Sequence, residues 1–266
     1  MGSAIVLRRW SNLQSIERPQ IARIVRIARP LVKLLRRPLS PTEDFHSNHY
    51  LRHNQRRLEH LASLGLDLSD KSVLEVGAGI GDHTHFFLDR GCQVVSTDGR
   101  ADNVRILAKR YPEIRVELLD LNSPSNSING TFDVVHCYGV LYHLDDPANA
   151  IKFMADHCRG TLLLETCVSY GDDSQVNLCA EDARTPSQSI SGTGCRPTRP
   201  WIFEQLQQYF PYVYMPATQP FHPEFPIDWT VEPTSDQQLT RAIFVASHTP
   251  VTNDKLVARI PMHQSR

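Results

Sequence analysis

The sequence predicts an α/β fold in which a doubly wound, mostly parallel sheet of seven strands is covered by helices on both faces. Three observations support this prediction. Short β-branched apolar runs alternate with stretches of helical spacing over residues 44–170, a strand runs directly into a glycine-rich turn at 73–84, and Asp98 ends the next strand. Strands that are apolar on both faces and separated by helices are typical of parallel sheets buried between helical layers.

Each element follows from its own pattern. Residues 53–66 place their leucines on one face of a helix, which predicts a helix ahead of the sheet. Runs rich in Val, Ile and Leu that are bounded by turn residues predict strands. In chain order these runs are 72–77, 92–98, 114–120, 132–139 and 160–167. The stretches between them with helical length and spacing are 102–111 and 147–158.

The last third of the chain completes the sheet. Residues 199–210 predict a helix, and 212–218 and 240–247 predict the sixth and seventh strands. The proline-rich segment 221–229 is excluded as a central strand because proline cannot donate to a sheet ladder. The polar stretch 171–200 is longer than an ordinary connection, and such loops usually form lids or binding elements.

These patterns divide the chain into a basic N-terminal helical arm (1–40), a domain with its lid (41–250) and a C-terminal tail (251–266). The arm holds nine Lys and Arg and one acid, so acids exceed bases in the rest of the chain. Residues 20–37 have the spacing of an amphipathic helix, which Pro30 should kink. Three uses of this helix stay open: packing on the body, peripheral contact with an anionic membrane, and contact with RNA or another polyanion.

Composition excludes several classes of protein. The chain has 266 residues, 41% hydrophobic and 21% charged, so it is neither disordered nor a minimal stapled scaffold. A formal net charge of −1 gives no global field toward nucleic acid, which is therefore the less favoured partner. The six cysteines form no CxxC pair, which favours reduced thiols and a cytoplasmic location. No apolar run approaches the roughly 18 residues of a transmembrane helix.

The segment VLEVGAGIGDHT (73–84) carries the functional signal. Its glycines allow a tight turn and close approach to a ligand, and the helix expected after them would direct N–H groups to the same point. Asp98 is placed to accept hydrogen bonds from both hydroxyls of a ribose. The third glycine comes one position earlier than in dinucleotide-binding turns, and the carboxylate of Glu75 before the turn suits a cationic ligand better than phosphate. The pattern indicates S-adenosylmethionine.

This segment resembles the signature of the class I methyltransferases, which is E-x-G-x-G-x-G after the first strand and an acid after the second. The matching residues are EVGAGIG (75–81) and STD (96–98). The resemblance spans about 70–250 and implies the Rossmann-like methyltransferase fold. It places the glycine turn beside the methionine part of the cofactor, Asp98 on the ribose, and the residues that follow the second and third strands around the adenine. The residues that it implies for cofactor binding are Glu75, Gly77, Ala78, Gly79, Gly81, Asp98, Gly99, Arg100, Asp120 and Leu121.

A closer resemblance begins at FDVVHCYGVLYHLDDP (132–147), which is similar to the tRNA wobble-uridine carboxymethyltransferases. It implies that Tyr138 and Tyr142 line the cofactor pocket and that Arg241 matches an arginine on the last strand of that branch. The twenty residues after the arm lack the tryptophan- and lysine-rich stretch with which that branch holds a carboxylated cofactor. We therefore expect ordinary S-adenosylmethionine, with Arg241 free to hold the methionine carboxylate or an acidic group of the acceptor.

Two residues are candidates for the base that removes a proton from the acceptor. His143 follows the fourth strand at the edge where such sheets bind ligands, and Glu165 ends the next strand. For the acceptor, Arg196 and Arg199 can clamp an acidic group, and His222 can close the same pocket. Each of these residues also has a structural interpretation: bracing a loop, starting a helix or filling the core.

Histidines recur at helical spacing before the first strand and again after the glycine turn. They are His46, His49, His53, His83 and His85. No acid or cysteine stands beside them at the spacing of a metal site, which needs three convergent ligands, so the sequence predicts no metal. Asn48, Tyr50 and His53 are instead candidates for a cap over the cofactor pocket, with a solvated helix face as the alternative.

The sequence therefore indicates a methyltransferase that methylates a hydroxyl of a small molecule, a sugar or a lipid-linked glycan. Two alternatives stay open. A tRNA-modifying (carboxy)methyltransferase is allowed by the basic arm and disfavoured by the acidic body, because RNA binding depends on a continuous basic surface. A non-catalytic cofactor-binding partner subunit is the other.

Overall fold

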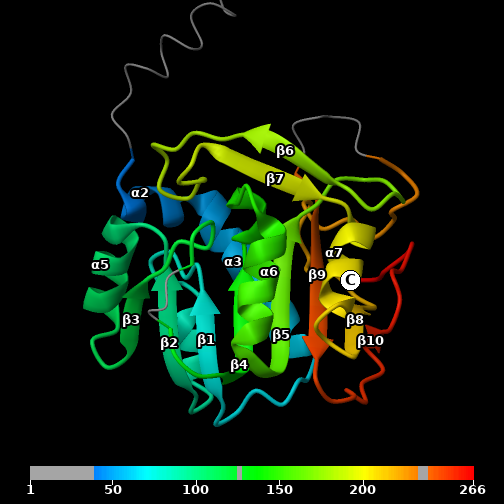
Figure 1. The fold of residues 1–266 in the computed structure, drawn as a ribbon, viewed down its shortest axis with the longest axis horizontal. Helices are drawn as coiled ribbons and strands as arrows, with labels where there is room; N and C mark the ends of the chain where they lie inside the picture. The colour runs from blue at the N-terminus through cyan, green and yellow to red at the C-terminus, as the bar shows by residue number, and fades with distance from the viewer. Residues whose placement is uncertain (1–38, 125–127, 233–238) are drawn as a thin grey trace, which may run out of the picture. The chain divides into compact units, whose positions relative to one another are not determined.

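The computed structural model describes residues 39–124, 128–232 and 239–266, and these form one unit (Figure 1). The helix predicted at 20–37 lies outside the described residues, so its three possible uses stay predictions. Within the described part, no helix has the length and apolar character needed to cross a bilayer.

The seven predicted strands are present, and so are the helices predicted within the described residues. The strands are β1 (Ser72–Val76), β2 (Gln93–Asp98), β3 (Arg115–Leu118), β4 (Phe132–Tyr138), β5 (Cys158–Cys167), β8 (Tyr212–Pro216) and β9 (Arg241–Ser247). The main helices are α3 (Asn48–Ser63), α5 (Ala101–Arg110), α6 (Pro147–Asp156) and α7 (Arg199–Gln207). Elements that the sequence did not predict are α2 (Pro41–Phe45), the 3₁₀ turn η2 (Leu141–His143), β6 (Val176–Ala180), β7 (Thr193–Pro197) and β10 (Leu256–Val257).

The main sheet has the order β10-β8-β9-β5-β4-β1-β2-β3. Five strands are parallel, from β3 to β5, while β9, β8 and β10 continue the sheet in antiparallel pairs. The strand order reverses between β1 and β4, and in open α/β sheets the ligand crevice lies at such a switch point. The short strand β10 lies in the predicted tail and pairs with β8, so the tail adds an eighth strand to the predicted seven.

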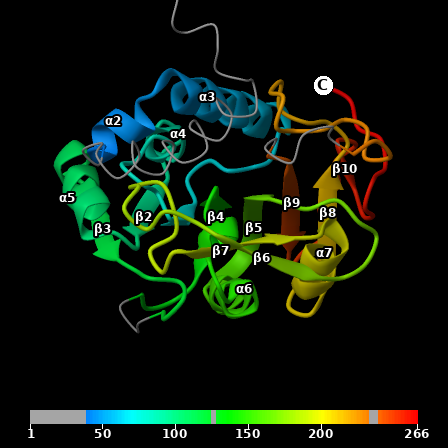
Figure 2. The same ribbon diagram turned by 90° about the horizontal axis from the view of Figure 1, so that it is seen from above.

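Helices cover both faces of the sheet, with α3 and α4 (Thr84–Leu88) on one side and α6 and α7 on the other (Figure 2). Neighbouring strand residues alternate between two hydrophobic cores. Val73 and Val134 belong to the core beneath α3 and α4, and Leu74 and Val135 belong to the core beneath α6 and α7. This alternation explains why the strands are continuously apolar in sequence.

Local capping fixes where several helices begin. Ser40 and Glu43 form a capping box at α2, and Asp146 accepts a hydrogen bond from the backbone N–H of Asn149 at 3.1 Å, with Pro147 opening α6. The helix expected directly after the glycine turn starts only at Thr84 and has five residues. The chain first makes further turns over 79–83, and the expectation that this helix directs its N–H groups to the ligand stays a prediction.

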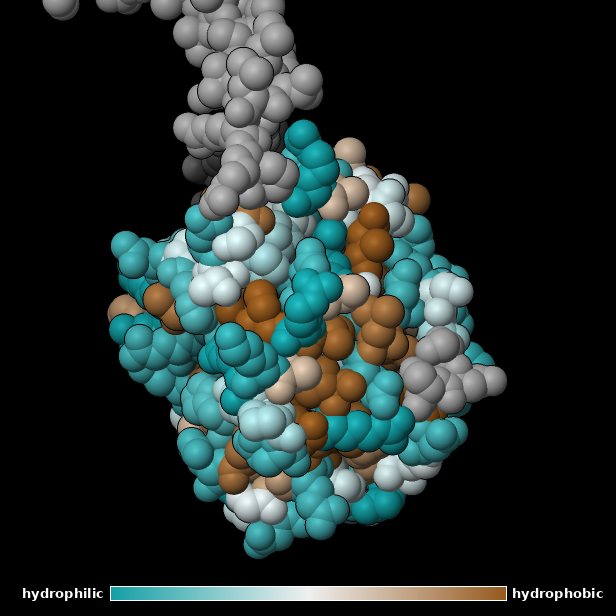
Figure 3. Space-filling model, turned by 90° about the vertical axis from the view of Figure 1, so that its left-hand side faces the viewer, coloured by the Kyte–Doolittle hydropathy of each residue, from teal (hydrophilic) through white to brown (hydrophobic). Residues whose placement is uncertain are grey.

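The stretch 171–200 forms a two-stranded antiparallel sheet of β6 and β7. This pair lies above the ends of the parallel strands (Figure 1), and the loop residues 186–190 between β6 and β7 face the crevice. At the far edge of the main sheet, β3 leaves Leu118 half exposed, and the surface on that side carries hydrophobic side chains ringed by hydrophilic ones (Figure 3). The crevice between lid and strand ends is the candidate site.

Candidate active site

The glycine turn after β1 brings bare backbone to the crevice. Gly77, Gly79 and Gly81 have φ angles of +67°, +58° and +87°, a region that side chains with a Cβ rarely adopt. A Cβ on Gly77 would lie 1.9 Å from Cγ2 of Val140, and one on Gly79 would lie 2.9 Å from the ring of Phe45. Gly77 and Gly79 line the crevice, so both conformation and space require glycine there.

Asp98, at the end of β2, holds this turn in place. Its Oδ2 accepts a hydrogen bond from the N–H of Gly79 at 2.9 Å, and its Oδ1 accepts from the N–H of Arg100 at 2.9 Å and from Nδ2 of Asn103 at 3.0 Å. Burial raises the pKa of Asp98 to about 6. An ionised carboxylate has about four acceptor positions, so Asp98 can accept from a further donor such as a hydroxyl.

Glu75 lies beneath the turn and is fully buried. Its Oε2 accepts hydrogen bonds from the hydroxyls of Thr84 at 2.6 Å and Ser96 at 2.7 Å. Burial raises the pKa of Glu75 to about 7. Because Glu75 also lines the crevice, a cationic ligand nearby would favour its ionised form.

The residues that the resemblance assigns to the adenine lie at the far end of the crevice. Asp120 and Leu121 line it, and a Cβ on Gly99 would lie 2.5 Å from Cδ1 of Ile190 in the lid. The guanidinium of Arg100 faces the lid, where its Nη2 lies 3.0 Å from the carbonyl oxygens of residues 183, 188 and 189. Arg100 therefore ties the lid to β2 and α5.

The crevice encloses about 1000 Å³ when its open mouth is included. It has three walls: the helices α2 and α3, the ends of β1, β2 and β4, and the lid loop. Lining residues from the first and third walls are Phe45, Tyr50, Asn54, Arg57, Pro186, Ser187, Gln188, Ser189 and Ile190.

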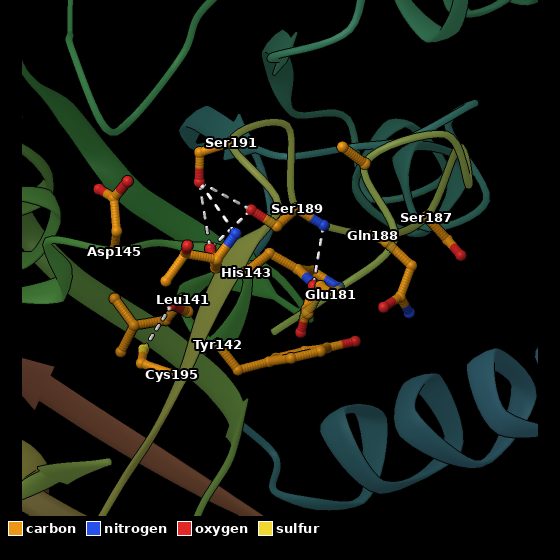
Figure 4. A network of polar contacts seen from close by, with 12 residues as sticks. Leu141, Tyr142, His143, Asp145, Glu181, Ser187, Gln188, Ser189, Ser191 and Cys195 are labelled. Atoms are coloured by element: carbon orange, nitrogen blue, oxygen red, sulfur yellow. Dashed lines mark hydrogen bonds and ion pairs between the residues drawn. The ribbon is translucent and has the colours of Figure 1, made fainter. Parts of the chain in front are cut away.

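His143 and Glu181 face each other at the boundary between the strand ends and the lid (Figure 4). Nδ1 of His143 lies 2.5 Å from Oε2 of Glu181, which also accepts a hydrogen bond from the N–H of Ser189 at 2.8 Å. Burial lowers the pKa of His143, and Glu181 offsets part of this effect. The contact places the ring proton on Nδ1, which leaves Nε2 as an acceptor in the neutral ring.

Glu181 is held as an anion. Burial alone would raise its pKa, but the contacts with His143, Ser189 and Arg196 together keep it below the usual value. Nη2 of Arg196 lies 3.3 Å from Oε1 of Glu181, and the Arg196 guanidinium also packs over the ring of Tyr142. A neutral imidazole oriented by a carboxylate is a suitable general base.

Behind Tyr142 lies a buried ion-pair network. Glu165 has no exposed surface and lies between Arg57, with Nη2 to Oε2 at 2.6 Å, and Arg241, with Nη1 to Oε1 at 3.1 Å. Arg241 also contacts the hydroxyl of Tyr142 at 3.2 Å and pairs with Glu224 at 2.6 Å. Of these residues, Arg57 and Tyr142 line the crevice.

The structure brings most of the predicted site residues together. Those that line the crevice are Glu75, Gly77, Ala78, Gly79, Asp98, Gly99, Arg100, Asp120, Leu121, Tyr138, Tyr142 and His143. Gly81 instead packs against Leu107 of α5, and Arg196 pairs with Glu181.

Four predicted residues lie elsewhere. Glu165 and Arg241 lie in the ion-pair network behind the wall, because each carboxylate there neutralises a buried guanidinium. Arg199 donates to the carbonyl oxygen of residue 261 at 2.6 Å and packs over Trp229, and His222 packs against His53 of α3. Neither Arg199 nor His222 is a crevice residue.

Sequence reasoning missed several crevice residues. Asn54 and Arg57 lie on the inward face of α3, and Asn54 contacts Nε2 of His83 at 3.2 Å. His136 is buried in β4, which lowers its pKa to about 3. The sequence offered two signals for these residues: a histidine inside the apolar run of β4 and a polar stripe on α3. It offered no signal for Glu181, which is one of several acids in a polar stretch.

Buried polar atoms in the crevice wall indicate a polar ligand. Oε1 of Glu75, Nε of Arg57, the hydroxyl of Tyr138 and both ring nitrogens of His136 have no hydrogen-bond partner among the described residues. Buried polar groups are nearly always paired, so a cluster of this kind is unusual without a ligand. These groups fit S-adenosylmethionine: Asp98 suits the ribose, Glu75 suits positive charge and Arg57 suits a carboxylate.

Fold and crevice together define an S-adenosylmethionine-dependent methyltransferase, in which a doubly wound sheet presents a glycine turn and the carboxylate of Asp98 at its switch point. Residues 47–217 match the family model described as "Methyltransferase domain". The match covers more than half of the chain, which therefore belongs to this family.

Two curated relatives are tRNA U34 carboxymethyltransferases. The protein of Actinobacillus succinogenes is 34% identical over 136 residues, which cover 48% of this chain and 40% of the relative. The protein of Mannheimia succiniciproducens is 33% identical over 137 residues, 47% of this chain and 40% of the relative. The matched region thus spans about two fifths of the length of these relatives.

Two solved structures share the fold. The N-terminal domain of EvdMO1, determined in the presence of SAH and D-fucose, has a TM-score of 0.55 at 18% identity and covers 87% of this chain and 97% of that one. Magnesium protoporphyrin IX methyltransferase from Synechocystis PCC 6803 with bound SAM has a TM-score of 0.50 at 16% identity and covers 89% and 99%. At these low sequence identities, the similarity shows a shared fold and nothing more.

Proposed function

We propose that this methyltransferase methylates a hydroxyl group of a small acceptor, such as a sugar or a lipid-linked glycan, and that His143 is its general base. The observation that carries the proposal is the 2.5 Å contact between His143 and Glu181 in the crevice wall. A hydroxyl needs a base as it attacks, because its proton must leave when the new bond forms.

When bound, S-adenosylmethionine supplies an electrophilic methyl group. His143 accepts the acceptor's proton on Nε2, and Glu181 stabilises the imidazolium that results. Arg196 balances the charge of Glu181 and fixes its position. The lid residues 186–190 exclude water and hold the acceptor in line, which is the larger part of what a displacement reaction requires of a protein.

Arg57 replaces Arg241 as the residue we assign to the methionine carboxylate. Arg57 lines the crevice and its Nε lacks a partner within the described chain, whereas Arg241 lies behind Tyr142. Arg57 already neutralises Glu165, so once it also holds the methionine carboxylate it has little capacity for a further carboxylate on the cofactor. This supports ordinary S-adenosylmethionine over a cofactor with an additional carboxylate.

A second candidate is modification of tRNA. The names of the curated relatives and the similarity over residues 132–147 favour it, and the excess of acids in residues 41–266 disfavours it. The two candidates differ in acceptor and in cofactor, so one pair of measurements separates them.

The experiment supplies methyl-labelled S-adenosylmethionine to the purified protein with total tRNA in one arm and with small-molecule and lipid fractions in the other. We expect label in the second arm. Label in tRNA alone, or a co-purifying cofactor heavier by one carboxylate, would contradict the proposal.

Variants test the base. His143→Gln and Glu181→Gln should lower kcat by about 10²–10⁴-fold, the range of general base catalysis, while binding of S-adenosylhomocysteine stays within about twofold. Asp145→Asn is the matched control for Glu181→Gln because Asp145 is an exposed carboxylate close to His143 in sequence. Equal rates in the Glu181 and Asp145 variants would exclude the assigned role.

A further inference from the structure

A second polar cluster lies at the opposite end of the Arg241 network, outside the crevice. His49 and His53 lie one helical turn apart on α3, and Glu224 comes from the loop between β8 and β9. Nε2 of His49 lies 3.4 Å from Oε1 of Glu224, and Nε2 of His53 lies 3.8 Å from Oε2. One ligand atom from each of the three residues falls within 4.8 Å of the others.

We propose that His49, His53 and Glu224 bind a zinc ion. Zinc is bound by imidazole nitrogens at about 2.0–2.1 Å and by carboxylate oxygens at about 2.0–2.2 Å, which places tetrahedral ligand atoms roughly 3.3–3.6 Å apart. The His49–Glu224 distance of 3.4 Å lies within this spacing, and the His53–Glu224 distance of 3.8 Å, to the other carboxylate oxygen, lies slightly above it. His49 is on the surface, so a rotation of its side chain can adjust its nitrogen to an ion that His53 and Glu224 hold.

An unpartnered buried atom supports the site independently. His53 is 1% exposed, and its Nε2 has no hydrogen-bond partner among the described residues although it is directed toward Glu224. A buried ring nitrogen without a partner is costly, and a metal ion would satisfy it. In the part of the chain that the structure describes, no other group of three such side chains converges in this way.

The surroundings set the choice of ion. Glu165 and Glu224 balance Arg57 and Arg241, so the network carries no net charge that would repel a cation. Glu224 shares its carboxylate with Arg241, which leaves most of the affinity to the two imidazoles. Imidazole ligands suit zinc and neighbouring transition metals, whereas magnesium and calcium prefer oxygen.

His222 braces the third ligand. Its Nδ1 accepts a hydrogen bond from the backbone N–H of Glu224 at 3.3 Å, and its ring packs 4.8 Å from that of His53. An ion at this site would tie α3 to the loop 221–225. Since Tyr50, Asn54 and Arg57 reach the crevice from α3, the ion would also stiffen that wall.

The experiment is a zinc titration of the full-length protein after removal of any affinity tag and treatment with a chelator. We expect one zinc ion per chain by calorimetry, a rise in Tm on adding zinc, and no such rise with magnesium. Cobalt gives a second readout, because a low-symmetry site with nitrogen ligands has strong visible absorption. No stoichiometric zinc binding would overturn the proposal.

The variant His49→Gln should weaken zinc affinity by roughly a hundredfold or more, because even partners outside the ligand set change metal affinity by about 10–100-fold. This side chain is exposed, so the fold should survive. His263→Gln is the matched control, since His263 lies 3.5 Å from Asp228 without a third ligand in the described chain. Equal affinity in the wild type and the His49 variant would exclude the site.

Discussion

Asp98 holds the glycine turn in place, and we propose that the same carboxylate binds the ribose of the cofactor. It holds the N–H groups of Gly79 and Arg100 and the amide of Asn103, and it faces the crevice. Because one side chain organises the turn and presents an acceptor to the ribose, its loss affects the turn and the ligand together. A variant series can separate these two effects.

We expect Asp98→Ala to weaken binding of S-adenosylmethionine by roughly tenfold to over a hundredfold, since losing a charged acceptor costs about 1.5–3 kcal/mol. Asp98→Asn keeps one acceptor oxygen and the side-chain volume, so its affinity for S-adenosylmethionine should lie between those of Asp98→Ala and the wild type. Asp102→Ala is the control, because Asp102 is exposed and pairs with Arg105. Calorimetry measures all three, and an unchanged affinity in folded Asp98→Ala contradicts the assignment.

At the scale of elements, the glycine turn depends on its fit against η2. Gly77 lies against Val140, which precedes η2, and this contact joins the ends of β1 and β4. Gly65, after α3, has nearly the same φ angle, but no atom of the described residues lies within 4 Å of the position that its Cβ would take. A substitution at either glycine therefore causes the same backbone strain, but only a substitution at Gly77 also clashes with Val140.

Gly65→Ala should cost about 1–2 kcal/mol of unfolding free energy from its left-handed backbone. Gly77→Ala should cost that amount and a further 1–3 kcal/mol or so from overpacking. Urea denaturation measures the free energy of unfolding of both variants. Adding Val140→Ala to Gly77→Ala should recover part of the difference, and no recovery would show that the clash is not the cause.

The lid is fastened by Arg100. Its Nη2 lies 3.0 Å from three carbonyl oxygens of the lid loop. We expect Arg100→Ala to accelerate tryptic cleavage after the exposed Arg184 several-fold, because loop opening exposes the backbone to protease. Arg105→Ala, on the same helix and paired with Asp102, should leave the rate unchanged. Equal cleavage rates in the two variants would show that Arg100 does not hold the lid loop in place.

Elements with a strong local pattern could be predicted, and those that depend on distant contacts could not. The parallel strands are apolar runs, and α5 and α6 have helical periods and turn residues at their ends. By contrast, β6 and β7 lie in a polar stretch and exist through pairing with each other, and β10 has two residues.

The same distinction applies to the site. Gly77, Gly79 and Asp98 belong to a local motif, whereas Glu181 reaches His143 only through the fold of the lid. Glu224 stands far along the chain from His49 and His53, so spacing alone could not join them.

At the scale of the whole molecule, stability depends on buried acids and histidines with opposite pH responses. Burial raises the pKa of Glu75 to about 7 and of Asp98 to about 6, and it lowers the pKa of His136 to about 3 and of His60 to about 4. The acids contribute stability that is lost as pH rises through their folded pKa, and the histidines contribute stability that is lost as pH falls below 6.5. The two trends have opposite signs, so a difference between variants is more informative than the pH dependence of the wild type alone.

Glu75→Gln isolates one of these groups. The unfolded pKa near 4.5 and the folded pKa near 7 imply that the wild type loses about 3 kcal/mol relative to the variant between pH 4.5 and 8, measured without cofactor. Glu59→Gln is a control of opposite sign, because the hydrogen bond from Arg56 lowers the pKa of Glu59 and its contribution is lost as pH falls below about 4.5. Urea titrations at three pH values measure both differences, and a constant difference for Glu75→Gln contradicts the prediction.

Within the described residues, β6 pairs with β7 and with no strand of the main sheet, which has a consequence for the changes that this hairpin can tolerate. Mutations, insertions and deletions in 171–198 can accumulate without shifting the register of any strand that carries the glycine turn or Asp98. The chain thus carries the glycine turn and Asp98 on the main sheet, and Glu181 and Arg196, which contact or position His143, on the hairpin. A changed hairpin would therefore change the acceptor pocket and the partner of His143 together, while the glycine turn stays in place.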